Sequence, residues 1–210
     1  MAITINGGGT VTGVSVGGLP DGIVDTDMIA TGAVATAKIA DTAVTDVKRG
    51  AGTILQQVQT TATGDVSSTE ASNIVASGHI CSVTPKQTGS KFLVEASGVS
   101  GHFNNSTATN PGALYYIYVS VNSGTYANVT TGPILNVHAT GDTGAWINVP
   151  VSFSFLASPS YSAGQTVAFQ PYFRRGAGDS STNDNFYYHH AGHSDMFGQV
   201  RSLRVTELSQ

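Results

Sequence analysis

The sequence is poor in charged residues. Only 10% of its 210 residues are charged, against an average of about 25% in soluble proteins. Lysine and arginine total nine, never gather beyond Lys48-Arg49 and Arg174-Arg175, and the formal net charge is −4. Because nucleic acids and anionic lipids are bound through clustered positive charge, we expect no nucleic-acid partner and no electrostatic membrane attachment.

Cysteine and long apolar runs are also scarce. The single Cys81 has apolar neighbours at alternate positions in SGHICSVTP, which predicts a buried strand residue and leaves no internal disulfide. The opening MAITINGGGT has neither a basic segment nor an apolar run, so we expect no secretory signal. No stretch approaches the ~18 apolar residues of a membrane-spanning helix, so we expect no membrane insertion.

A ten-residue repeat occupies residues 22–51. Its units are GIVDTDMIAT, GAVATAKIAD and TAVTDVKRGA, in direct succession. Each unit has too few and too small apolar side chains to bury them by itself, so it needs stacked neighbours or other chains. The apolar positions that align are Val24, Val34 and Val44, and Ile29 with Ile39.

The repeat does not fit one long helix. At about 100° per residue, ten residues leave each valine rotated about 80° from its predecessor, so no helix face collects them. An extended chain keeps them on one side, and single helical turns separated by glycine also fit. The repeat predicts a three-chain shaft or an arm laid onto a larger assembly, and a flexible linker is the alternative.

Residues 1–21 predict an extended arm. Apolar and polar residues alternate around Gly7-Gly8-Gly9 and Gly17-Gly18, a pattern typical of strands and turns. No helical pattern and no Lys-Ser/Thr pair follows the glycine triplet, so we do not expect a nucleotide-binding loop. The predicted organisation is an attachment arm (1–21), a repeat neck (22–51) and a head domain (52–210).

The sequence of the head predicts a succession of β-strands. Segments such as TPKQTGS and GAGDSSTNDN supply turn residues between the strands, and no sustained 3.6-residue period is present. This pattern predicts an all-β, antiparallel β-sandwich of jelly-roll type. The strands are expected near 53–60, 73–83, 91–99, 113–121, 134–139, 146–156, 165–173, 186–190 and 199–208.

One strand carries bulky residues on both faces. In ALYYIYVSV, Tyr115, Tyr116 and Ile117 follow one another, so large side chains point to both sides of the sheet. We expect one face in the domain core and the other in a subunit interface or a groove. A partly exposed row of tyrosines on a monomer is the alternative.

The chain resembles tail-fibre and appendage proteins of tailed bacteriophages. The opening ITINGGGTVTGVSVGGLPDG and the repeat units of the AVATAKIADT kind are similar to their N-terminal parts. The segments GTILQQVQT, VTPKQTGSKFLVEASG, FLASPSYSAGQTVAFQPYF and SLRVTEL are similar to a β-sandwich domain of the same proteins. The resemblance implies a homotrimeric virion component with a surface knob, attached to the tail or decorating the capsid.

The densest polar cluster is FYYHHAGHSDMF. His189, His190, His193 and Asp195 are residue types that ligate transition metals. Their spacing is not the helical i, i+4 pair of a hydrolytic zinc site, and adjacent histidines in a strand point to opposite faces. We therefore expect interface or loop histidines and no metal or other cofactor, and these four residues are the weak metal candidates.

Catalytic signatures are absent from the sequence. No G-x-S-x-G motif occurs, and Glu70, Glu95 and Glu207 stand far apart in the sequence, so no carboxylate pair for glycoside hydrolysis is identified. We expect no enzymatic activity.

Ligand binding is the remaining chemical possibility. Loop segments near 101–112 and 179–195 combine amide side chains with aromatic rings, a combination that suits sugar hydroxyls and sugar C–H faces. Solvated loops contain the same residue types, so an ordinary surface is the alternative. The candidates for a host-glycan adhesin are Phe103, Asn104, Asn105, Tyr187 and Tyr188.

Overall fold

A computed structural model gives the fold in two units, Met1–Thr45 and Asp46–Gln210. It contains strands and turns, and the described residues include no α-helix. The structure describes residues 4–5, 11–12, 29, 31, 33–35, 39, 43, 48–63, 66–68, 74–104, 112–138, 146–176, 186–189 and 200–210.

The described residues of the first unit include one small strand pair. β1 (Thr4–Ile5) pairs antiparallel with β2 (Val11–Thr12), so that Ile5 lies opposite Val11. These strands flank the glycine triplet, where the sequence predicts strands and a turn.

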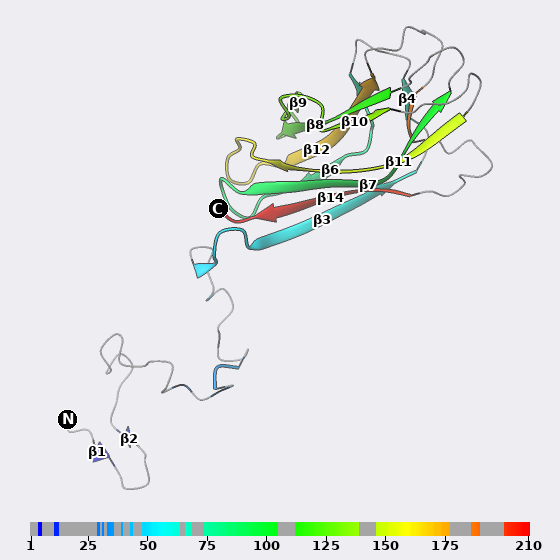
Figure 1. Ribbon diagram of the computed structural model, residues 1–210. Helices are drawn as coiled ribbons and strands as arrows, with labels where there is room; N and C mark the ends of the chain where they lie inside the picture. Colours follow the sequence, from blue (N-terminus) through cyan, green and yellow to red (C-terminus); the bar gives the residue numbers. More distant parts are fainter. Residues whose placement is uncertain are drawn as a thin grey trace. The chain divides into compact units, whose positions relative to one another are not determined.

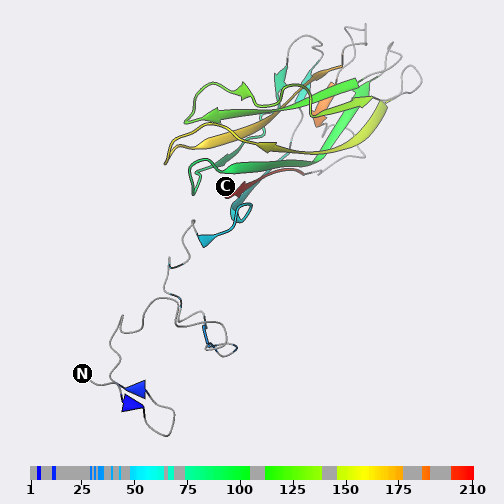
Figure 2. The ribbon, with the colours of Figure 1, turned by 60° about the vertical axis from the view of Figure 1, so that its left-hand side comes forward.

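The second unit is built from two antiparallel sheets stacked face to face (Figure 1, Figure 2). Sheet 1 is formed by β3 (Ile54–Ala62), β14 (Arg201–Leu208), β7 (Lys91–Asn104), β11 (Trp146–Ala157), β13 (Phe186–His189) and β4 (Val66–Ser68). Sheet 2 is formed by β10 (Leu135–His138), β8 (Gly112–Val121), β12 (Val167–Arg175), β5 (Val75–Ala76), β6 (Cys81–Val83) and β9 (Ala127–Asn128).

Along the chain, the eight strands β3, β6, β7, β8, β10, β11, β12 and β14 change sheet at every step except between β8 and β10, which are neighbours in sheet 2. Across sheet 1 the order is β3–β14–β7–β11, and across sheet 2 it is β6–β12–β8–β10. The first and last strands of the unit, β3 and β14, are therefore neighbours in sheet 1. The all-β, antiparallel prediction for the head is confirmed.

The core lies between the sheets, where the buried apolar residues of both sheets meet. Phe92, on β7, meets Phe169, on β12, with ring centroids 5.3 Å apart, and Tyr115 meets Phe153 at 5.6 Å. Cys81 is fully buried in this core, as predicted. Burying a side chain the size of phenylalanine contributes roughly 2–3 kcal/mol, so these contacts hold the two sheets together.

Each predicted strand of the head has an observed counterpart, with two differences. The expected strand 73–83 is divided into β5 and β6, because Gly78 has a φ of 70° and turns the chain between them. The short strands β4 and β9 were not predicted. With three and two residues, they are too short to show an alternating pattern.

Candidate functional site

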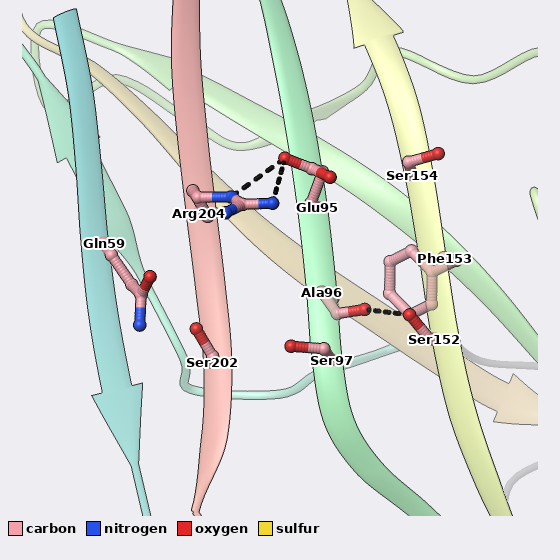
Figure 3. Close-up of a pocket in the computed structure, with 9 residues that line it drawn as sticks. All are labelled: Gln59, Glu95, Ala96, Ser97, Ser152, Phe153, Ser154, Ser202 and Arg204. Carbon is pink, nitrogen blue, oxygen red and sulfur yellow. Dashed lines mark hydrogen bonds and ion pairs between the residues drawn. The ribbon is translucent and has the colours of Figure 1, made fainter.

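The outer face of sheet 1 carries a polar trough of about 510 Å³ (Figure 3). Four neighbouring strands supply its walls, and serine is the commonest residue among them. The lining residues are Gln59, Glu95, Ala96, Ser97, Ser152, Phe153, Ser154, Ser202 and Arg204.

Strand register places these residues in rows across the sheet. Arg204 lies opposite Gln59 on one side and Glu95 on the other, and Ser154 lies opposite Glu95. The next row pairs Ser202 with Ser97. Because side chains alternate along a strand, residues two apart share the outer face and the rows form one continuous surface.

A β-bulge shapes one wall of the trough. The register between β11 and β7 shifts between Val151 and Phe153, and Ser152 lies at the shift. The Ser152 hydroxyl donates to the carbonyl oxygen of Ala96 at 3.2 Å (Figure 3). Bulges bend a strand and re-aim its side chains, which explains why backbone of β7 and β11 lines the trough here.

An ion pair lies at the centre of the trough. Both Nε and Nη2 of Arg204 are 2.9 Å from Oε2 of Glu95 (Figure 3). The side chains are 41% and 31% exposed, so water screens the pair and its contribution to stability is less than about 1 kcal/mol. Its free carboxylate oxygen and remaining N–H groups can still bond a ligand.

The trough is lined by groups that can bind a polar ligand. Hydroxyl, amide, guanidinium and carboxylate groups together offer donors and acceptors to a ligand rich in hydroxyl groups. The residues lining the trough include no histidine or cysteine, and its one carboxylate already pairs with Arg204.

The second surface of interest is a tyrosine cluster on sheet 2. Tyr118 stacks on Tyr172 with centroids 4.0 Å apart, and Tyr126 lies 6.1 Å from Tyr172. Burial raises the pKa of all three hydroxyls, so they stay protonated at neutral pH. All three side chains are partly exposed.

The bulky strand distributes its side chains as its alternation predicts. Tyr115 and Ile117 are in the core, whereas Tyr116 lies outside the core cluster and its hydroxyl accepts a 3.1 Å hydrogen bond from Nε of Arg174. Tyr116 is nevertheless only 4% exposed within the single chain. An interface or groove on this face therefore has Tyr118 and Tyr172 available to it, and not Tyr116.

The predicted ligand residues come from two strands that the fold brings together. Phe103 and Asn104 end β7, and Tyr187 and Tyr188 lie in β13. The two strands pair at Phe186 opposite Phe103 and at Tyr187 opposite His102. The side chains of these residues and the whole of Asn105 lie outside the described parts, so ligand binding by these residues stays a prediction.

The histidine cluster falls mostly outside the described residues. His189 ends β13, where its backbone lies opposite Val66, while His190, His193 and Asp195 are not described. Within the described part of the chain, no group of three or more His, Cys, Asp or Glu side chains could hold a metal ion.

Three of the aligned repeat residues are described, and all three are exposed in the single chain. Ile29 is 43% exposed, Val34 54% and Ile39 44%. Val24 and Val44 lie outside the described residues.

Sequence reasoning did not identify the trough. Its outward positions on β7 and β11 could have been found as the polar residues of each alternating strand, for example Glu95 and Ser154. A single sequence does not show which strands are neighbours in a sheet. The rows of residues that line the trough could therefore not be predicted from it.

No helix in the described part of the chain is long and apolar enough to cross a membrane. No protein-family model matches the chain, and no curated protein matches it.

Proposed function

We propose that this chain is a structural protein of a tailed-bacteriophage virion. It acts as a homotrimeric appendage in which residues 1–21 attach to the particle, residues 22–51 form the neck and residues 52–210 display a knob on the particle surface. Its partners are two further copies of itself and the tail or capsid proteins that hold the arm.

The exposure of the repeat aliphatics is the observation that carries the proposal. Ile29 and Ile39, ten residues apart at equivalent positions, are each more than two-fifths exposed, although isoleucine is among the most frequently buried residues. The head completes its own core without them. Residues of this kind at a fixed spacing are explained when other chains cover them.

The topology of the head supports the jelly-roll part of the proposal. The facing orders β3–β14–β7–β11 and β6–β12–β8–β10 are those expected for an eight-stranded jelly roll in which the chain changes sheet at every step except β8 to β10. Jelly rolls are common among viral surface proteins and lectins, and both uses fit a virion knob.

Native mass spectrometry and light scattering of the full chain test the trimer. We expect a trimer for the wild type and a shift to monomers for Ile29→Asp/Ile39→Asp, because a buried, unpaired carboxylate is unfavourable. The control Thr31→Asp/Thr42→Asp adds the same charge at polar positions of the repeat and should leave the trimer intact. A monomeric wild type at all concentrations would contradict the proposal.

Imaging of intact particles distinguishes attachment to the tail from attachment to the capsid. A map that resolves what residues 1–50 contact would place the arm on a tail protein or on the capsid lattice, where the chain would serve as a decoration or cement protein. Particles that lack the chain altogether would refute the virion assignment.

A host-glycan adhesin is the second candidate, and the polar trough of sheet 1 favours it. Its hydroxyls, its amide and its Arg204–Glu95 pair offer the contacts that a saccharide needs. Alanine substitutions in 101–112 and 179–195 test the loops: lost host adsorption with intact particles favours the adhesin, whereas undecorated or unstable particles favour the structural role.

A further inference from the structure

Aliphatic side chains that face solvent gather at one end of sheet 1. Ile54 is 61% exposed and Leu156 49% exposed, and Leu93 and Leu208 are partly exposed. Ile54 lies opposite Leu208 across β3 and β14, and Leu156 lies opposite Leu93 across β11 and β7. We name these four residues the arm-root patch.

The patch is continuous and hollowed. Leu208 lies opposite Lys91, two residues before Leu93, so the two leucines are diagonal neighbours across β14 and β7. Leu156 and Leu208 share a shallow hollow of about 420 Å³ with Ala51. Lys91 carries the one charged side chain among the described residues that line it, and a lysine can extend its amine into water.

The hollow is bordered by the segment that joins the neck to the head. The Gly52 N–H donates to the Ser209 carbonyl at 2.9 Å, and the Ser209 N–H donates back to the Thr53 carbonyl at 2.9 Å. The Ser209 hydroxyl also donates to the Gly50 carbonyl at 2.8 Å. Residues 50–53 are therefore fixed beside the arm-root patch, within the same compact unit.

We propose that the arm-root patch is the surface through which the heads of neighbouring copies of this chain contact one another. The inference rests on the proposed trimer and adds which face of the head takes part. Three chains joined along residues 22–51 must hold their segments 50–53 close together, because the repeat ends at residue 51. Those segments are hydrogen-bonded beside the patch, so the three patches meet immediately beyond the neck.

A second copy fits this surface better than an unrelated partner. Only two residues separate the end of the repeat from Ile54, which leaves little room for another molecule between the three heads. The four patch residues are uncharged, and Lys91, beside them in the hollow, can extend its amine into water, so equivalent patches can pack with little charge repulsion. Exposed isoleucine and leucine side chains are also unusual on a free domain surface when they are contiguous.

The substitution Leu156→Asp tests the inference in the full chain. We expect the dissociation constant between copies to rise about tenfold or more, since a central apolar contact is replaced by a buried charge. Val200→Asp is the matched control. Val200 is 53% exposed and lies eight residues before Leu208 along the chain, roughly 26 Å for an extended strand, so the trimer should be unchanged.

Cysteine cross-linking gives a second measurement if the aspartate variant folds poorly. Cys81 is fully buried, so an added surface cysteine is the reactive one. Under mild oxidation we expect Leu156→Cys to give disulfide-linked dimers within the trimer and Val200→Cys to give none. A wild-type trimer that Leu156→Cys does not cross-link overturns the inference and leaves the trimer standing, whereas a monomeric wild type overturns both.

Discussion

The carboxylate of Glu207 accepts a 2.7 Å hydrogen bond from the hydroxyl of Ser90, 117 residues earlier in the sequence. Glu207 is fully buried near the end of β14, and Ser90 directly precedes β7. The same carboxylate accepts the backbone N–H groups of Lys86 and Gln87 and the amide of Gln56. A buried charge is tolerated here because donors surround it, and it ties β14 to β3 and to the turn before β7.

We expect Glu207→Gln to destabilise the head by about 2–3 kcal/mol, because the amide turns an N–H group toward donors that need an acceptor. Urea unfolding at neutral pH measures the loss. The control is Glu95→Gln, which breaks a partly exposed ion pair and should cost less than about 1 kcal/mol. Equal losses for the two variants would contradict the role assigned to Glu207.

His79 predicts a pH dependence of stability. It is 3% exposed, its Nε2 lies 3.2 Å from the carbonyl oxygen of Thr60, and its Nδ1 has no hydrogen-bond partner among the described residues. Burial, and to a smaller extent the charge of Arg201, lower the pKa of His79 below its usual value of 6.5. The folded state therefore holds a neutral imidazole where the unfolded chain takes up a proton.

Because the unfolded state binds the extra proton, the free energy of unfolding should fall as pH drops below about 6.5 and level off below the folded pKa. The contribution of one group is at most about 1.4 kcal/mol per pH unit. Chemical unfolding of the wild type and His79→Gln at several pH values between 7.5 and 5 measures it. Identical pH profiles for the two proteins would refute the assignment to His79.

Substitution by alanine should change the stability of the protein differently at Gly50 and at Gly52, which both lie just before β3. Gly52 has a φ of 82°, a conformation that L-residues adopt at a cost, whereas no such φ occurs at Gly50. A Cβ atom added at either position meets nothing within 4 Å, so neither substitution causes a steric clash and the two differ in backbone conformation. We expect Gly52→Ala to cost about 1–2 kcal/mol and Gly50→Ala to be close to neutral in thermal or urea unfolding. A neutral Gly52→Ala would show that the backbone here can relax.

Filling the polar trough with a large side chain tests the proposal that the trough binds a host glycan. Ser97 is exposed in the trough, so Ser97→Trp should occupy it and reduce host adsorption at least about tenfold if binding there is required. Ser82→Trp is the matched control, since Ser82 is an exposed strand serine on sheet 2. Counting adsorbed particles is the measurement, with particle assembly checked in parallel. Undiminished adsorption of particles that carry Ser97→Trp would show that the trough is not needed for binding to the host.

Most strands of the head could be predicted because their signal is local. In β12, for example, buried Val167, Phe169 and Phe173 alternate with less buried residues, and this period of two is visible in any window of the sequence. The burial of Cys81 followed from the same alternation. The missed β9 shows the limit, because two exposed residues between turns carry no period.

The candidate surfaces could be predicted only in part. Glu95, Arg204 and Ser154 were visible as strand residues, but their neighbourhood depends on β14 lying between β3 and β7 and on β11 lying beyond β7. The partners of Glu207 and the joining of Ile54 to Leu156 in one patch depend on the same order of strands.

The sequence by itself determined that residues 52–210 are rich in strands and that residues 22–51 repeat every ten residues, because alternation and repetition are properties of neighbouring residues. Only the tertiary structure decided which strands pair, which side chains form the trough and where the exposed aliphatics collect. Those outcomes depend on burying apolar area between segments more than 100 residues apart, as for Ser90 and Glu207, and local preference does not encode such a choice.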